Sequence, residues 1–286
     1  MFSQILGEVT ACRCLSCSKG VFSMKSFLVW CLPLVLTILG VAQTPSYHTV
    51  PPRIPGFLTF YFTDAFENPG SIYKFDGLNR SVSTIYTRPR GQIYSFTFHP
   101  FVPEKLYFVN ANDNKIFRIT WLQDHWSSEE VVYEHTTYVR DIAFAPDPSP
   151  TAPPSSAGPR WTLFFSEAWG AKGGKIYYFD RSNRPVLFFD VPFDWAGDFA
   201  FDENGCLYLS SGNVSPAKLY KVEGRNVITL YEHPRPIKGF VVKEGKVYFT
   251  DWDGSVLLLD LAISQVFLLF NNPNRFRWIS DVGFRP

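Results

Sequence analysis

The sequence predicts an all-β protein, and three observations lead to this fold class. Of the 286 residues, 17% are aromatic, with 28 phenylalanines, and such side chains suit pleated, half-buried strands. The chain also has 19 glycines and 22 prolines, and both residue types interrupt helices. Short apolar and aromatic segments, finally, recur along the chain in a fixed order. The net charge of +1 gives no basic surface for nucleic acid, so we expect no nucleic-acid partner.

Residues 1–42 predict an N-terminal extension that ends in a signal peptide. The apolar run at 27–42, FLVWCLPLVLTILGVA, follows Lys25 and ends in small residues. It is short for a bilayer of ~30 Å, which needs about 20 residues. We therefore expect cleavage after Ala42 and a secreted or extracytoplasmic protein. The alternative is a protein anchored in the membrane by residues 27–42, and translation from Met24 in place of Met1 would leave a conventional signal.

The number of cysteines predicts that packing, and not disulfide bonds, stabilises the folded chain. One cysteine, Cys206, remains after residue 42, so no intrachain disulfide can form in the mature chain. The removed part contains a Cys12-x-Cys14-x-x-Cys17 pattern, but it lacks a fourth ligand for zinc. Residues 43–56, QTPSYHTVPPRIPG, are rich in proline and predict an extended linker.

Residues 57–286 contain five repeats of one unit of strands. Each repeat has a strand with the pattern of FYFTD, and these strands end at Asp64, Asn110, Glu167, Ser211 and Asp251. Two further strands follow each of them. Four repeats also have a strand in front, at 94–100, 140–146, 197–203 and 238–244. The first repeat lacks this strand, but SDVGFRP at 280–286 supplies it from the other end of the chain.

This arrangement predicts a five-bladed β-propeller of four-stranded antiparallel blades. Closing the ring with the C-terminal strand leaves only short, protected sheet edges. A β-sandwich has a similar density of strands but gives no reason for a fixed four-strand order repeated five times. A ring of six blades is the alternative. Residues 147–160 are rich in proline and serine and predict a surface loop in the third blade.

Two segments carry a resemblance to known propellers. KVYFTDWDGSVLLLDL (246–261) resembles the YWTD repeat of lipoprotein-receptor propellers. GDFAFDENGCLYLSSGN (197–213) is similar to the NHL and gluconolactonase/regucalcin repeats. The resemblance covers residues 57–286 and implies a propeller superfamily that has several activities. Those families usually have six blades, whereas this sequence has five repeats.

Polar residues gather where propeller geometry places the mouth of the central channel. The inner strands begin at Ser95, Asp141, Asp198, Gly239 and Asp281. Converging carboxylates repel one another, so a cation or hydrogen-bond donors must offset them. Oxygen ligands in this number suit Ca²⁺ or another divalent cation. The gluconolactonase resemblance implies such a metal, held by Glu, Asn and Asp. The candidate ligands are Asp141, Asp198 and Asp281, with Glu167 and Asn110 as a second set.

The alternative is that these carboxylates are structural. In propellers of the YWTD type, which this sequence resembles, the repeated Asp accepts backbone N–H bonds and ties blades together. We expect this role for Asp64 and Asp251, because one polar acceptor at one repeat position is what a scaffold needs. For the three aspartates at the inner strands, the structural and the metal-binding interpretations both stay open.

The loops at the same end of the ring carry aromatic and histidine side chains. The candidate ligand-binding residues are Trp169, Trp195, Trp252, Trp278, His135 and His233. Exposed aromatic rings beside polar groups are typical of surfaces that bind a small molecule, a glycan or a protein. The two histidines could also act as general bases, or be packing residues repeated at one position. A membrane contact is expected only if the N-terminal segment stays uncleaved.

The functional prediction is an exported binding module that uses its acidic, aromatic channel face. The sequence has no G-x-S-x-G elbow, no H-E-x-x-H and no Rossmann glycine pattern. The alternative is a divalent-metal-dependent lactonase or esterase of the gluconolactonase kind. A glycosidase is a third option and needs paired carboxylates across a cleft. Geometry discriminates, because a metal enzyme needs Asp141, Asp198 and Asp281 to converge on one point.

Overall fold

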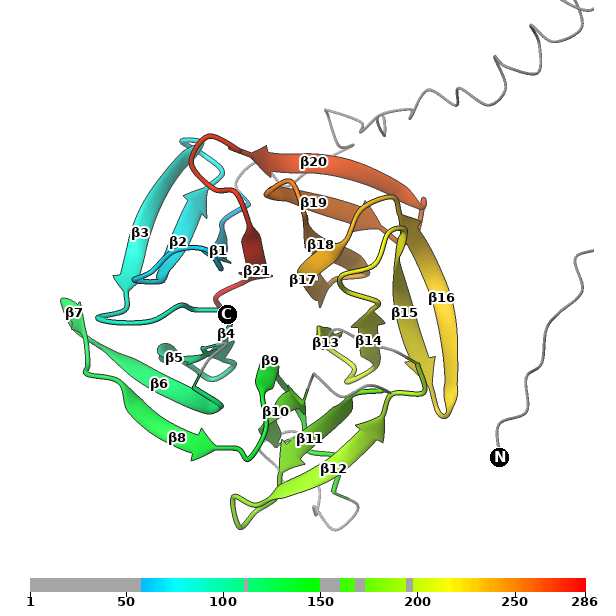
Figure 1. Ribbon diagram of the computed structural model, residues 1–286, viewed down its shortest axis with the longest axis horizontal. Helices are drawn as coiled ribbons and strands as arrows, with labels where there is room; N and C mark the ends of the chain where they lie inside the picture. Colours follow the sequence, from blue (N-terminus) through cyan, green and yellow to red (C-terminus); the bar gives the residue numbers. More distant parts are fainter. Residues whose placement is uncertain (1–57, 111–112, 150–159, 168–172, 194–197) are drawn as a thin grey trace, which may run out of the picture. The chain divides into compact units, whose positions relative to one another are not determined.

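The computed structural model describes residues 58–110, 113–149, 160–167, 173–193 and 198–286. Strands in these residues form five sheets that surround a central axis, which is the predicted all-β five-bladed propeller (Figure 1). The described residues include no helix, and so none that could span a membrane. The predicted signal peptide and linker lie outside the described residues.

Each blade places its strands in order from the axis outward. Blade 1 consists of β21 (Ile279–Gly283), β1 (Phe60–Asp64), β2 (Ser71–Asp76) and β3 (Ser81–Thr87). Blade 2 consists of β4 (Ser95–His99), β5 (Val102–Val109), β6 (Lys115–Leu122) and β8 (Glu130–Glu134), with the short β7 (His125–Trp126) against the end of β6. Blade 3 consists of β9 (Val139–Pro146), β10 (Trp161–Glu167), β11 (Lys175–Phe179) and β12 (Pro185–Asp190). Blade 4 consists of β13 (Phe199–Phe201), β14 (Leu207–Ser210), β15 (Ala217–Glu223) and β16 (Asn226–His233). Blade 5 consists of β17 (Ile237–Lys243), β18 (Lys246–Asp251), β19 (Ser255–Asp260) and β20 (Gln265–Asn271).

The last strand of the chain closes the ring, as the repeat pattern predicts. Strand β21 pairs antiparallel with β1, in a register that places Phe62 opposite Val282. The Thr63 and Ser280 hydroxyls, which are 217 residues apart in the sequence, are hydrogen-bonded at 2.8 Å. Blade 1 is therefore built from both ends of the propeller sequence.

Apolar side chains fill the spaces between adjacent blades. Each pair of neighbouring blades in the described residues shares one hydrophobic cluster. Because successive side chains of a strand point to opposite faces, Phe60 and Phe62 of β1 pack toward blade 5, whereas Tyr61 packs toward blade 2. All of β1 is buried, but β3 at the rim of the same blade is mostly exposed. The aromatic excess of the sequence thus lies mainly between blades.

The structure adds one element that the repeat pattern does not predict. After β6 the chain turns at Gln123, which has a φ of 58°, and β7 folds back on β6. The Trp126 indole then donates to the Ile85 carbonyl of blade 1 at 2.7 Å. This contact ties the rims of blades 1 and 2 together.

Candidate functional site: the channel mouth

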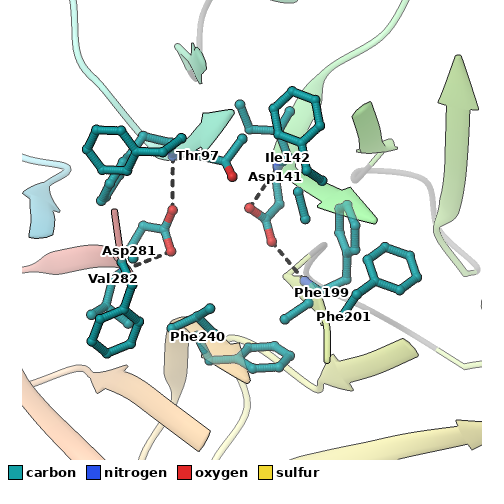
Figure 2. Close-up of a pocket in the computed structure, with 16 residues that line it drawn as sticks. Thr97, Asp141, Ile142, Phe199, Phe201, Phe240, Asp281 and Val282 are labelled. Atoms are coloured by element: carbon teal, nitrogen blue, oxygen red, sulfur yellow. Dashed lines mark hydrogen bonds between the residues drawn. The ribbon is translucent and has the colours of Figure 1, made fainter. Parts of the chain in front are cut away.

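The inner strands begin at one end of the ring, which we call the mouth. Two aspartates there bind the backbone of a neighbouring blade (Figure 2). Asp281 accepts the Phe96 N–H of blade 2 at 2.9 Å, and Asp141 accepts the Phe199 N–H of blade 4 at 2.8 Å. Each also accepts the N–H of the residue that follows it. The Ser95 hydroxyl donates to Asp141, so blades 2, 3 and 4 are linked through this one carboxylate.

Burial makes these two carboxyl groups weak acids. Removal from water, together with the negative charge of Asp198, raises the pKa of Asp141 to about 7. Burial and the nearby Asp141 raise the pKa of Asp281 well above its ordinary value. At neutral pH the pair therefore carries less negative charge than two surface aspartates would.

Asp198 has a different partner. Its Oδ1 lies 3.2 Å from the Arg140 Nε, and both side chains are buried. The Arg140 guanidinium also stacks on the Tyr94 ring, 3.5 Å from its centroid. Burial raises the pKa of Asp198 to about 6, and the charges of Arg140 and Lys238 limit the rise. The third aspartate of the ring is thus half of a buried ion pair.

These three aspartates do not fit a divalent cation site. The oxygens of Asp141 and Asp281 accept N–H and O–H bonds, and Asp198 faces an arginine. Among the described residues, no group of three or more His, Cys, Asp or Glu side chains is placed to hold a metal ion. The geometry matches the structural interpretation of the inner aspartates.

The second set of metal candidates lies apart from these aspartates. Glu167 accepts the Tyr177 hydroxyl at 2.8 Å, and its Oε2 lies 3.7 Å from the His135 Nε2. Burial alone would raise the pKa of Glu167, but hydrogen bonds and the charge of His135 lower it overall. The Asn110 amide donates to Asp113 at 2.6 Å. Glu167 thus contacts a strand of its own blade and the connection between blades 2 and 3, and Asn110 contacts its own turn.

The two histidines are equivalent in structure as well as in sequence. His135 is hydrogen-bonded to the Tyr133 hydroxyl at 2.9 Å, and His233 to the Tyr231 hydroxyl at 3.2 Å. Each imidazole lies 5.1 Å from a phenylalanine ring of the second strand of a blade, in β10 and in β18. His233 is fully buried. The pair is a repeated packing unit.

The aspartates at the ends of β1 and β18 cap turns, as we expected. Asp64 accepts the N–H groups of Phe66 and Arg277, at 2.9 and 3.1 Å. Asp251 accepts those of Asp253 and Ser255, each at 3.0 Å. Because Arg277 lies in the connection that leads to β21, Asp64 also holds the closing strand in place.

The channel below the aspartates is narrow. A cavity of about 100 Å³ lies along the axis, and all five inner strands line it (Figure 2). Phe199, Phe201 and Phe240 are among its lining residues, but their side chains belong to the clusters between blades. The volume of this cavity is well below the roughly 300–1,000 Å³ of typical small-molecule pockets.

A surface of a different kind lies above blades 5 and 1. Trp252 is 48% exposed, and its ring centroid lies 4.6 Å from that of Trp278. Phe66, which is 62% exposed, continues the series at 4.4 Å from Trp278. We call Phe66, Trp278 and Trp252 the aromatic row. Trp252 also lines an open groove of about 340 Å³ with Asn213, Ser215, Arg235, Pro236 and Asp253.

A buried lysine lies beneath the aromatic row. The Lys238 Nζ is 4.0 Å from the centroid of the Trp252 ring and 4.1 Å from that of Trp278. It donates to Asn213 Oδ1, and the side chain has no exposed surface. Burial, and then the charge of Arg140, lower the pKa of Lys238 to about 7. Trp169 and Trp195, the other two predicted tryptophans, lie outside the described residues.

Sequence analysis did not identify Arg140, Lys238 or Phe66 as residues of the site. The sequence does mark the two cations. Arg140 directly precedes Asp141, and Lys238 directly precedes Gly239, which occupies the equivalent position of its own repeat. In blade 2, Tyr94 occupies the same position as these two cations. All three are the first residues of the strands predicted at 94–100, 140–146 and 238–244, whereas only the second residue of each strand is predicted to lie at the mouth. Phe66 has no such signal, since it lies in an irregular turn.

Comparisons with known proteins support the fold. No protein-family model matches the chain, and no curated protein matches it. A chain in the crystal structure of a nidogen/laminin complex is 14% identical, with a TM-score of 0.50, over 79% of this chain and 97% of that one. A luciferin-regenerating enzyme is 14% identical, with a TM-score of 0.45, over 80% and 76%. A calcium-binding regucalcin from Agrobacterium tumefaciens is 12% identical, with a TM-score of 0.42, over 73% and 70%. At 14% identity, the likeness to the chain of the nidogen/laminin complex is one of fold alone.

Proposed function

We propose that this protein is an exported binding module that recognises its ligand or protein partner through the aromatic row and the adjoining groove. The observation that carries the proposal is the exposure of Trp252 and Phe66 on either side of Trp278. Large aromatic rings beside polar side chains contribute much of the binding energy at recognition surfaces. These rings lie in turns and a connection between strands and pack against one another, so little conformational entropy is lost when a ligand binds.

The groove favours binding over hydrolysis. It offers amide, hydroxyl, guanidinium and carboxylate groups around an open space next to Trp252. The carboxylates of the inner strands, which a metal-dependent lactonase or esterase would use, already accept internal hydrogen bonds. Export rests on the apolar run at 27–42, and sequencing of the secreted protein should give Gln43 as its first residue.

Ligand selection tests the proposal. The immobilised protein is screened against a random peptide library and a glycan array, and the affinity of each selected ligand is then measured. We expect Trp252→Ala and Phe66→Ala each to weaken binding at least about tenfold, as for aromatic residues that dominate interfaces.

Phe101→Ala is the matched control. Phe101 is 64% exposed, but it lies in the turn after β4, at the end of the ring away from the mouth. It should leave affinity unchanged. Selected ligands that bind the Trp252→Ala and Phe66→Ala proteins as tightly as the wild type would refute the proposed surface.

A further inference from the structure

Lys238 is an unusual residue for the interior of a β-propeller. Lysines are rarely buried without an anionic partner, because removing an ammonium group from water is costly. Its contacts in the described residues are two indole faces and the neutral Asn213 amide oxygen. The rings attract the cation but do not neutralise it. The fold therefore holds a cation directly under an exposed aromatic surface.

Two further donors near this lysine are not satisfied. The Arg140 Nη2 and the Trp278 Nε1 are buried and have no hydrogen-bond partner among the described residues. Guanidinium, ammonium and indole N–H groups only donate. Within the described residues, these buried donors therefore have the capacity to bind a further acceptor.

Lys238 and the two charged groups that act on it carry one net positive charge when the lysine is protonated. These two groups are Arg140 and Asp198, which pair with each other at 3.2 Å. Two cations and one anion sum to +1. Across the groove, Arg235 pairs with Asp253 and lies 3.8 Å from the Asp251 Oδ2, so its charge is already offset by these carboxylates. A ligand group with one negative charge would balance the cluster.

The groove lies next to this lysine but is separated from it by two side chains. Asn213 and Trp252 line the groove and also contact Lys238, so these two side chains separate the ammonium from the open space. Asn213 is exposed and lies in the turn between β14 and β15. A ligand oxygen that replaced the Asn213 amide oxygen would reach Lys238 without any change in the blades.

From these contacts we infer that the groove binds a carboxylate group of the ligand, which accepts a hydrogen bond from Lys238 and packs against Trp252. This rests on the proposed function and specifies its ligand chemistry. A carboxylate carries the one negative charge that balances Arg140, Lys238 and Asp198, whereas a phosphate or sulfate dianion carries more. The hydrogen bond to a charged acceptor is also stronger than the one to Asn213.

Above neutral pH, Lys238 should take up a proton when the carboxylate binds. The ligand favours the charged ammonium, but burial and Arg140 make Lys238 lose its proton near pH 7. Above pH 7, Asp198, with a pKa of about 6, is ionised and Arg140 stays charged, whereas Asp141, with a pKa of about 7, loses its proton in the same range and also disfavours an anion. Well above pH 7, affinity should therefore fall about tenfold for each pH unit.

Thermal unfolding and calorimetry of the full chain test the inference with sodium acetate as the probe. Sodium chloride, phosphate and sulfate serve at equal ionic strength. Acetate should raise the melting temperature and bind more tightly at pH 6 than at pH 8.5. Lys238→Met keeps the length and apolar contacts of the side chain and should abolish the effect. Lys221→Met removes a lysine of β15 that pairs with Glu223, and it should keep the effect.

Three results would overturn the inference. One is acetate binding that survives in Lys238→Met. Another is phosphate or sulfate binding at least as tightly as acetate, which would indicate a general anion site. The third is a wild-type affinity that does not change between pH 6 and 8.5, a measurement that stands even if the variant fails to fold. If Trp252→Ala weakens the selected ligands but Lys238→Met does not, the proposed function stands and the carboxylate inference fails.

Discussion

Gly239 of blade 5 lies against the backbone of blade 1. A Cβ at this position would overlap the Ser280 carbonyl oxygen and lie 2.8 Å from the Asp281 Cα. These are backbone atoms and cannot move aside. Gly239→Ala should therefore lower the free energy of unfolding by about 1–3 kcal/mol, as overpacking does.

Urea unfolding measures the effect, with Gly283→Ala as the comparison. A Cβ at Gly283 would meet the edge of the Phe96 ring at 3.2 Å, and a ring can shift slightly. The loss there should be smaller. If both substitutions lowered the free energy of unfolding equally, contact with the backbone of blade 1 would not be the reason why position 239 requires glycine.

The buried carboxyl and ammonium groups predict a stability minimum near neutral pH. Asp141 has a pKa of about 7 in the folded chain and an ordinary value of 3.8. Between these values the folded chain holds a proton that the unfolded chain has lost, so the free energy of unfolding falls as the pH rises. The pKa of Asp281 is shifted in the same direction. Lys238 acts oppositely between about 7 and 10.5, where the unfolded chain holds the extra proton and stability rises with pH.

Urea unfolding at pH 5, 7 and 9 should show this minimum. Asp141→Asn cannot titrate at this position, so its stability should fall less steeply between pH 5 and 7, whatever its stability at pH 5. A variant with the same slope as the wild type would show that Asp141 ionises at its ordinary pH in the folded chain.

At the scale of the strand, β21 is the element on which the ring depends. It contributes the buried Ile279 and Val282 to the cluster between blades 5 and 1, and Asp281 to the mouth. Deleting residues 280–286 would leave β1 without its inner neighbour. We expect this deletion to abolish cooperative unfolding or to lower the melting temperature severely.

Circular dichroism during heating measures this result. Deletion of residues 285 and 286 alone removes exposed residues after the last strand and should have little effect. A protein without residues 280–286 that melts like the full chain would contradict closure by β21.

The order of the strands could be predicted from the sequence because the information is local and repeated. Each second strand, such as Phe60–Asp64, alternates its faces in the same way, and the missing strand of one repeat appears at 280–286. The role of the inner aspartates could not be predicted. An aspartate at this position of the repeat could bind either a backbone N–H, as Asp281 binds that of Phe96, or a cation. The sequence is the same in both cases, and only the position of the neighbouring backbone decides between them. The contact of Lys238 with Trp278 likewise joins residues that are distant in sequence.

At the scale of the whole molecule, the structure predicts a propeller whose stability does not depend on calcium. The carboxylate oxygens at the mouth already accept hydrogen bonds from the backbone, so a metal ion would have to replace these N–H donors. Millimolar Ca²⁺ and EDTA should leave the melting temperature unchanged. A metal that binds the folded state tightly would raise the melting temperature by several degrees. Such a rise, lost in Asp198→Ala, would revive the alternative of a metal-dependent hydrolase.

The pairing of β1 with β21 also constrains how the protein can be made. The hydroxyls of Thr63 and Ser280 are separated by 217 residues, so β1 leaves the ribosome long before the strand that completes its blade. Throughout synthesis of the other four blades, β1 presents an unpaired edge. Such edges invite pairing with other chains. Two chains that are synthesised on one messenger RNA can therefore exchange β21, so that the strand of one chain pairs with β1 of the other. This risk ends only when residue 283 has left the ribosome and β21 has paired with its own β1.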